Sequence, residues 1–340
     1  ELTSHNQKIF LHKEISLWNS IKPLFNEILF EPYLPSYLHT IEKFEYFLKK
    51  TKPKVIIQLY ETGPYAKAIQ ISAKKLGIRT VGIQHGLIPS DYPDYIFKEV
   101  QEHTNPLGNI IPDSTLVFGN FYKKLLTETG SYPIDKVSIL GHPEYLDTNK
   151  IKKITSNNFD EENIFKDKKI ILLPLVARLS TITNNAYKII LDTLYDNLKN
   201  DDDYIILIRP HPGDRLTQEY LQQLYPAKNF IASKASLIVD ILSSNLIVTI
   251  MGSTVSTEAV LFEKPVLLVN LSNNINEIDV VSSEMLKKKV AHLVSLDKLI
   301  VKLKQILETF NESNVQNRQD FLIDFFNLGE ELDLKKLIYR

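Results

Sequence analysis

Cysteine is absent from the 340 residues of this chain. Without thiols the protein can have no disulfide framework, no thiolate nucleophile and no zinc site built on cysteine. The absence is compatible with a cytoplasmic protein, which is the location that we expect. Because the chain begins with Glu1 rather than methionine, we also expect residues upstream of it in the full protein.

Long apolar runs are absent as well. A membrane-spanning helix needs about 20 consecutive apolar residues, whereas the longest apolar runs here, KKIILLPLVA and SNLIVTIM, have the length of β-strands. No signal peptide is recognisable. The sequence therefore predicts no membrane span. For the amphipathic helix expected at 297–309, peripheral contact with a membrane is an alternative to packing within the fold.

The chain has no excess of charge of either sign, since 40 Lys and Arg residues stand against 41 Asp and Glu residues, for a formal net charge of −1. Such a chain offers no basic field that would attract a nucleic acid, and none is expected as a partner. Any anionic ligand must therefore be bound by a few local groups. Apolar residues make up 44% of the chain, which is typical of a folded globular protein.

Several ligand-binding motifs are missing. Neither G-x-G-x-x-G after a strand nor G-x-x-x-x-G-K-[ST] occurs, so the usual dinucleotide site and the P-loop have no support. No H-E-x-x-H and no histidine cluster has the spacing of metal ligands, so we expect neither a metal nor another cofactor. The acidic run Asp201-Asp202-Asp203 precedes an expected strand, and we interpret it as a solvated turn.

What the sequence does contain is a regular alternation of short apolar runs with amphipathic helical segments. This alternation is typical of an α/β fold whose parallel sheets are covered by helices. Helical periodicity also extends over residues 11–50 and the C-terminal part of the chain. Strands are expected at 54–61, 79–84, 114–119, 136–141, 169–175, 204–210, 244–251 and 264–271.

A polar segment rich in Lys and Asn interrupts the alternation at 151–168 and is predicted to be a linker. It would separate an N-terminal domain at 1–150, helical over 1–50, from a C-terminal domain at 169–340. Only four strands are recognisable before the linker, so the N-terminal domain is either truncated at its start or completed by residues 1–50. We predict two Rossmann-like parallel-sheet domains that face a central cleft, toward which their strands direct their carboxyl ends.

Arg209 and His211 stand in the segment IRPHP, directly after an expected strand. The prolines stiffen the turn, so both side chains can be presented at little entropic cost. A guanidinium group matches the oxygens of a phosphate, and an imidazole can neutralise a phosphate that leaves. The alternative is structural: Arg209 would form a surface salt bridge and His211 would cap the turn.

The segment GSTVSTEAV predicts a second anion site, where Gly252, Ser253 and Thr254 open a helix after a strand. Free N–H groups and the positive end of the helix dipole make such a terminus suitable for a phosphate. Glu258 lies one turn further along, where it could accept from ribose hydroxyls. The alternative is an ordinary Ser or Thr N-cap with a capping-box glutamate.

Two candidate bases follow strands of the N-terminal domain. His85 comes after the strand at 79–84, and its type of side chain titrates near neutrality. Glu61 ends the neighbouring run and would either act as the base itself or orient His85. His142, in the segment LGHPEYL, is better suited to shaping a hinge together with Pro143 than to chemistry.

Five segments within residues 54–330 together resemble the GT-B superfamily, and in particular the branch that builds bacterial and archaeal surface and capsular polysaccharides. That branch includes capsule-synthesis transferases, polysialyltransferase-like enzymes and CDP-glycerol polyol-phosphate transferases, with UDP-GlcNAc 2-epimerases as more distant relatives. The segments are IQHG, VFGNFYKKLL, VSILGHPEYL, IRPHP and GSTVSTEAVLFEKPVLL.

The resemblance implies a nucleotide-sugar donor bound by the second domain and an acceptor approached by the first. His85 is similar to the histidine proposed as the base in that family, and His211 to the histidine at the donor phosphate. In the epimerase branch a pair of glutamates is expected where this chain has Thr257 and Glu258. The implied donor-binding residues are Arg209, His211, Gly252, Ser253, Thr254 and Glu258, and the acceptor-side residues are Gln84, Gly86 and Asp91.

We therefore expect a metal-independent glycosyltransferase that moves a sugar from a nucleotide-activated donor to a hydroxyl of a surface glycan, free or lipid-linked. Since the basic-x-His-Pro motif recurs among users of cytidine nucleotides, a CMP- or CDP-activated donor is favoured. The catalytic residues would be His85, Glu61 and His211. Alternatives are polyol-phosphate transfer, epimerisation or hydrolysis of a UDP-sugar, and a non-catalytic subunit that binds nucleotide sugars.

Overall fold

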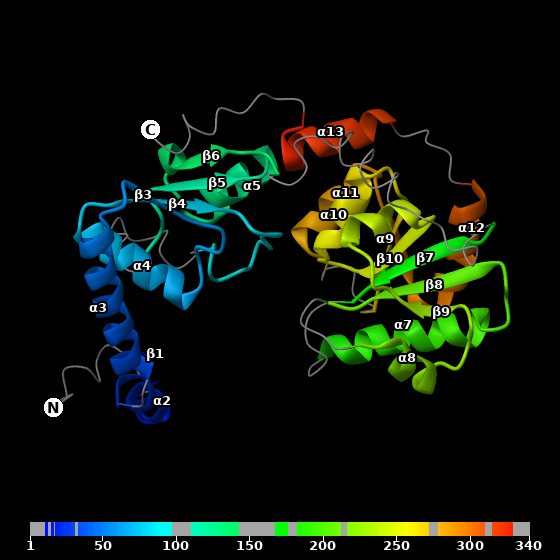
Figure 1. Cartoon of the computed structure of the whole chain (residues 1–340), viewed down its shortest axis with the longest axis horizontal. Helices are drawn as coiled ribbons and strands as arrows, with labels where there is room; N and C mark the ends of the chain where they lie inside the picture. Colours follow the sequence, from blue (N-terminus) through cyan, green and yellow to red (C-terminus); the bar gives the residue numbers. More distant parts are fainter. Residues whose placement is uncertain are drawn as a thin grey trace. The chain divides into compact units, whose positions relative to one another are not determined.

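Two parallel β-sheets form the framework of the chain in a computed structural model (Figure 1). The prediction of an α/β fold with two parallel sheets is thereby confirmed. No helix within the described residues is both long and apolar enough to cross a lipid bilayer. The structure describes residues 11–12, 15–16, 18–30, 33–96, 110–142, 167–175, 182–211, 216–271, 278–309 and 315–328.

The larger sheet has six strands in the order β12-β11-β10-β7-β8-β9, all paired in parallel. The chain therefore winds outward from β7 to β9 and then restarts at β10, on the other side of β7. This is the strand order of dinucleotide-binding domains, and it creates a switch point between β7 and β10. The strands are β7 (Lys169–Pro174), β8 (Tyr204–Arg209), β9 (Phe230–Ala232), β10 (Leu246–Ile250), β11 (Val266–Asn270) and β12 (His292–Ser295).

Helices on both faces bury the central strands of this sheet almost completely. Residues 170–174 of β7 and 204–208 of β8 are all buried, which explains why these strands are continuous apolar runs without alternation. Each such leucine or isoleucine contributes about 1.5–3 kcal/mol through burial. The helices are α7 (Ile182–Leu198), α8 (Gln218–Leu224), α9 (Leu237–Ser243), α10 (Thr254–Leu261), α11 (Val280–Lys287) and α12 (Leu299–Thr309).

The smaller sheet has four strands in the order β3-β4-β5-β6, and β4 pairs in parallel with both β3 and β5. The helices before it follow the predicted periodicity, but Leu11–His12 and Ile15–Ser16 form a two-residue antiparallel pair instead of a helix. The elements are β1 (Leu11–His12), β2 (Ile15–Ser16), α2 (Trp18–Phe30), α3 (Tyr33–Thr51), β3 (Val55–Gln58), α4 (Pro64–Lys75), β4 (Arg79–Ile83), β5 (Ser114–Val117) and β6 (Val137–Ile139).

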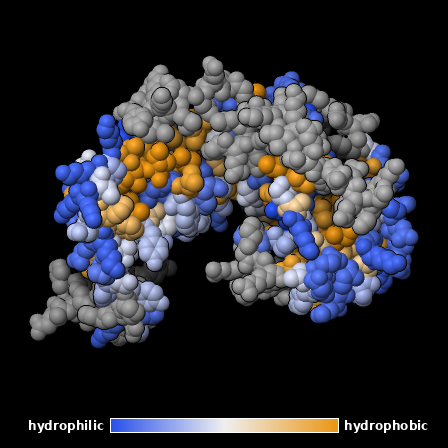
Figure 2. Space-filling view, in the orientation of Figure 1, coloured by the Kyte–Doolittle hydropathy of each residue, from blue (hydrophilic) through white to orange (hydrophobic). Residues whose placement is uncertain are grey.

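Strand β3 lies at the edge of the smaller sheet and is less covered than the strands inside it. Ile57 is 46% exposed, and Leu59 and Tyr60 after it are exposed as well, whereas Thr115 and Leu116 of β5 are fully buried. Figure 2 shows apolar surface over this part of the chain. The apolar run that predicted a buried strand at 54–61 therefore belongs to a strand with one open side.

The described residues divide into two compact units. The first takes in residues 11–84 and 110–116, and the second takes in residues 85–96 and 117–328. The predicted linker at 151–168 lies outside the described residues up to position 166. The predicted domain limits therefore stay a prediction.

Two strands of the larger sheet were not expected from the sequence. β9 has only three residues, and β12 begins with an exposed His292, so neither forms an apolar run long enough to stand out. Both lie toward the edges of the sheet, where less of each strand is buried. The acidic run at 201–203 is a turn, as expected: the N–H of Asp203 donates to Asp201, whose other oxygen lies 3.4 Å from Lys304.

The C-terminal helix α13 (Val315–Phe326) packs against α5 (Asn120–Lys124) within the second unit. The rings of Phe121 and Phe325 stack with centroids 4.2 Å apart. This approach needs a glycine at the start of α5, because a Cβ on Gly119 would lie 2.2 Å from the carbonyl oxygen of Asp324. The packing of α13 thus depends on the absence of one side chain.

We expect Gly119→Ala to destabilise the protein by about 1–3 kcal/mol, because the added methyl group must push the α13 backbone away. Chemical denaturation followed by far-ultraviolet circular dichroism measures the loss. Gly86→Ala is the control, since a Cβ there meets no atom within 4 Å. Equal unfolding midpoints for the two variants would show that the seam between α5 and α13 tolerates the methyl group.

Candidate functional site

The switch point of the larger sheet brings the two predicted anion-binding segments to the same edge of the sheet. Arg209 ends β8 in register with Pro174 of β7, and Gly252 follows β10 on the other side of β7. Strands lie about 4.8 Å apart, so the two segments leave the sheet about 10 Å from each other. That separation suits a ligand that carries two phosphates.

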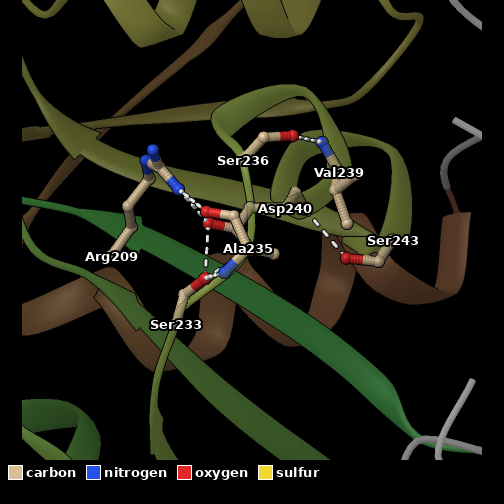
Figure 3. Close-up of polar contacts among 7 residues, drawn as sticks. All are labelled: Arg209, Ser233, Ala235, Ser236, Val239, Asp240 and Ser243. Atoms are coloured by element: carbon tan, nitrogen blue, oxygen red, sulfur yellow. Dashed lines mark hydrogen bonds and ion pairs between the residues drawn. The ribbon is translucent and has the colours of Figure 1, made fainter. Parts of the chain in front are cut away.

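Arg209 is held firmly by groups that the sequence analysis did not identify. Its Nη1 donates to Asp240 Oδ2 at 2.7 Å and to the carbonyl oxygen of Ala235 at 2.8 Å (Figure 3). Asp240 lies on α9 and its side chain is 3% exposed, against 19% for Arg209. The salt bridge that the structural alternative predicts for Arg209 is therefore present, although it is largely buried and not on the surface.

Burial raises the pKa of Asp240, while hydrogen bonds from Ser233 and Arg209 and the charge of Arg209 oppose the rise. Ser233 Oγ lies 2.6 and 2.7 Å from the two carboxylate oxygens. No motif in the sequence links positions 233 and 240 to 209, because they come from three different elements. His211 is half-buried, and Pro212, the last residue of the predicted motif, lies outside the described residues.

The turn at Gly252 differs in one respect from the expected phosphate loop. Its φ of +77° is one that glycine adopts readily, and its N–H donates to Ser282 Oγ at 3.2 Å. Asp279 caps α11 with Oδ1, and a Cβ on Gly252 would lie 3.7 Å from its Oδ2. The amide of Gly252 is thus engaged, and a carboxylate stands near it. An anion at this turn would have to accept from the N–H groups that follow.

Helix α10 begins at Thr254, and Ser253 is its N-cap residue without a side-chain cap hydrogen bond. This observation removes the alternative of an ordinary serine cap with a capping box. Thr257 donates from its hydroxyl to the carbonyl oxygen of Thr254 at 2.8 Å, so its side chain serves the helix. Glu258 is buried at 7% exposure, and its contact with a ribose stays a prediction.

His85 lies two residues after the end of β4 and is exposed. Although the ring reaches solvent, desolvation by the surrounding protein lowers the pKa of His85. The imidazole is therefore neutral at pH 7, which is the form that accepts a proton. Gln84 is buried and extends the sheet, since its N–H donates to the carbonyl of Leu116 at 2.9 Å, while Asp91 is exposed and Gly86 half-buried.

Glu61, the rival base, is 1% exposed. Its side chain lies across β4 at Gly82, where a Cβ would come within 2.7 Å of Glu61 Cγ. Gln70 of α4 donates to the carbonyl oxygen of Glu61 at 2.7 Å and to Gln58 at 2.9 Å. Both the backbone and the side chain of Glu61 are thus part of the packed interior. His85 is therefore the better candidate for a base that takes a proton from an acceptor hydroxyl.

His142 lies in an aromatic cluster. Its ring centroid is 4.3 Å from that of Phe118 and 5.6 Å from that of Phe326, and the residue is 8% exposed. Burial lowers the pKa of His142 to about 4. A histidine kept neutral in this way is a packing residue, whereas the hinge role predicted for it together with Pro143 stays a prediction, because Pro143 lies outside the described residues.

Across the described ranges, histidine and acidic side chains nowhere gather in a group of three or more that could hold a metal ion. Besides the carboxylates of Asp240, Asp279 and Glu258, the candidate site contains hydroxyls, backbone N–H groups, imidazoles and the guanidinium of Arg209. These latter groups suit a phosphate, because each of them can donate a hydrogen bond to an anionic oxygen.

Comparison with known proteins supports the architecture. No protein-family model matches the chain. An uncharacterised protein of Methanocaldococcus jannaschii is 25% identical over 246 residues, or 67% of this chain. The chain spans 40% of the length of that curated relative.

Three solved structures have a similar fold. S. aureus MnaA in complex with UDP has a TM-score of 0.59 at 16% identity, with 87% of this chain and 77% of that one covered. The M. jannaschii UDP-GlcNAc 2-epimerase with UDP-GlcNAc and UDP has a TM-score of 0.55 at 20% identity, covering 81% and 75%. A glycotransferase of kitacinnamycin has a TM-score of 0.53 at 11% identity, covering 86% and 77%.

The chain has the GT-B fold. The predicted fold is thereby confirmed, while membership of the GT-B superfamily stays a prediction. The capsular and polysialyltransferase-like branch within it stays a prediction, because identities of 11–20% carry no information on the reaction.

We expect His142→Phe to remove part of the acid sensitivity of the protein. The pKa of His142 is depressed from its ordinary 6.5 to about 4, so its neutral form stabilises the fold fully above pH 6.5. That stabilisation is lost progressively as the pH falls from 6.5 to about 4, by about 3 kcal/mol at most.

Unfolding free energies between pH 7 and pH 4 test this expectation. The wild-type protein should lose more stability over that range than His142→Phe does. His39→Phe, at an exposed position on α3, should follow the wild type. If the unfolding free energies of the wild type and of His142→Phe fall in parallel as the pH is lowered, protonation of the buried histidine does not cause the loss of stability in acid.

Proposed function

We propose that this chain is an enzyme that acts on a nucleotide sugar bound at the switch point of the larger sheet. The observation that carries the proposal is the pairing of a fixed guanidinium, Arg209, with the start of α10 on the two sides of β7. Structures of the same fold, S. aureus MnaA and the M. jannaschii epimerase, were solved with UDP. A diphosphate therefore fits both the donor groups and the fold.

Within this proposal the reaction is glycosyl transfer to an acceptor hydroxyl. His85 accepts the proton of the acceptor, whose oxygen attacks the anomeric carbon of the sugar. The bond from that carbon to the phosphate oxygen breaks, and the nucleoside diphosphate leaves with the electron pair. Arg209, His211 and the N–H groups at 253–254 donate to the phosphate oxygens as their charge grows, an effect for which one lost donor costs about 3 kcal/mol.

The donor nucleotide that we propose is UDP. The sequence favours a cytidine nucleotide through the motif around His211, whereas S. aureus MnaA and the M. jannaschii epimerase, which have a similar fold, were solved with UDP. In this proposal the residues around Arg209 contact only the phosphates, so the motif there does not decide the nucleobase. A surface glycan remains the proposed acceptor, on the resemblance of the sequence alone.

Epimerisation of a UDP-sugar is the second candidate, favoured by the similarity to the M. jannaschii UDP-GlcNAc 2-epimerase. One residue weighs against it. Where the resemblance predicts a pair of glutamates for an epimerase, position 257 is a threonine whose hydroxyl bonds within α10. Only Glu258 of that pair is present. An epimerase would convert UDP-GlcNAc without any acceptor, and nuclear magnetic resonance of the sugar distinguishes the two reactions.

A nucleotide panel tests donor binding. We expect UDP at 100 times its dissociation constant to stabilise the protein by about 2.7 kcal/mol, which corresponds to a rise in melting temperature of about 5–10 °C. CMP, CDP, GDP and TDP at equal concentration should give smaller shifts, and Arg209→Ala should reduce the shift given by UDP without abolishing it. A larger response to CMP or CDP would restore the cytidine donor, and no response to any nucleotide would refute the proposed function.

The roles of the two histidines are tested by turnover. We expect His85→Ala and His211→Ala each to lower the release of UDP from its sugar donor by more than tenfold, because each loses a proton-transfer or charge-neutralising group. His292→Ala is the matched control, since that exposed histidine also has a pKa lowered by desolvation and lies on β12. Unchanged turnover at equal melting temperature would remove the altered histidine from the mechanism.

A further inference from the structure

The contact between Arg209 and Asp240 uses only one edge of the guanidinium group. Both of its hydrogen bonds to described residues, to Asp240 and to the carbonyl of Ala235, start from Nη1. In Figure 3 the other two nitrogens of Arg209 point away from Asp240. An arginine that is tied at one nitrogen can still present the others as a pair of parallel donors.

Asp240 is itself fixed from several sides. Ser233 Oγ contacts both carboxylate oxygens and accepts from the N–H of Ala235 at 3.2 Å, so the loop before α9 closes around the carboxylate. Ser236, the N-cap of α9, accepts from the N–H of Val239 at 3.3 Å. These bonds hold the carboxylate in one place, at the carboxyl end of β8 where Arg209 emerges.

Stability alone is a weak reason for such a pair. Removing a carboxylate and a guanidinium from water carries a large desolvation penalty, and apolar residues of similar volume often stabilise a fold as well or better. Pre-organisation is a stronger reason. An arginine side chain gives up much rotamer entropy when it is immobilised, and a side chain already fixed by the fold does not lose that freedom again on binding.

We propose that Asp240, supported by Ser233, is a positioning residue that fixes Arg209 so that its two remaining nitrogens donate to a phosphate of a nucleoside diphosphate. The inference rests on the proposed function, since it assigns the ligand of the same site. Asp240 carries a charge of the same sign as the phosphate and does not touch it. Its effect on binding passes through Arg209 and concerns the phosphates alone, not the nucleoside.

Calorimetric titration of the full chain with UDP and with uridine tests the assignment. We expect Asp240→Asn to weaken UDP binding about tenfold, because the guanidinium loses its charged anchor, and to leave uridine binding unchanged. Ser233→Ala, which keeps the ion pair but loosens the carboxylate, should weaken UDP binding about threefold. This second variant decides the question if Asp240→Asn does not fold.

A double-mutant cycle separates positioning from a second, independent role. On the background of Arg209→Ala, the change Asp240→Asn should have no further effect on UDP affinity, because Asp240 acts only through Arg209. Asp192→Asn is the control: that carboxylate on α7 also accepts from a hydroxyl and a basic side chain, those of Tyr225 and Lys188. Its removal should leave UDP binding intact.

The outcomes distinguish this inference from the proposed function. If the wild-type protein binds UDP but Asp240→Asn and Ser233→Ala bind it equally well, the positioning role is wrong and the nucleotide site stands. If Asp240→Asn weakens UDP and uridine alike, the residue supports the fold and not Arg209. If the wild-type protein binds no nucleoside diphosphate, the proposed function fails and this inference fails with it.

Discussion

Parallel pairing of β-strands is the constraint on which the site depends. A chain that forms a parallel sheet must return to the starting edge after every strand, so all strands leave the sheet at the same edge. In the larger sheet, β7 is the strand at which the winding reverses, and the segments after β8 and β10 therefore open on its two sides. Positions more than forty residues apart in the sequence are brought to the same place by this rule alone.

Few charged groups are available for an anion at that edge of the larger sheet. Arg209 is paired with a carboxylate that is almost completely buried, and Gly252 has its amide engaged by Ser282 with Asp279 close by. Both observations reduce the number of groups free to bind an anion. They also make the remaining donors more directional, because a fixed side chain and a fixed turn present their N–H groups in a single orientation.

Two positions of the second unit, away from the candidate site, show how close packing restricts the side chains that the fold can accommodate. Gly119 leaves room for the backbone of α13, and His142 is kept neutral by the aromatic rings around it. Both follow strands of the smaller sheet. Burial distinguishes them from His85, whose ring is exposed.

The sequence by itself determined the α/β fold, eight of the ten strands of the two parallel sheets and the strand ends at which Arg209, Gly252 and His85 lie. These features depend on local periodicity and on buried apolar runs, which can be recognised within a short window of residues. The sequence did not reveal the strands at 230–232 and 292–295, because three or four residues near the edge of a sheet form too weak a hydrophobic pattern.

Only the tertiary structure decided how each polar group is used. Asp240 contacts Arg209 from a helix, and Ser233 contacts Asp240 from a loop, although no spacing in the sequence connects them. The hydroxyl of Ser282 accepts from the amide of Gly252, and Glu61 is packed against Gly82. Such contacts join residues from different elements, and their energies depend on burial and on distances of a few tenths of an ångström. A linear pattern of residue types contains neither quantity, which is why the partners of the site had to come from the fold.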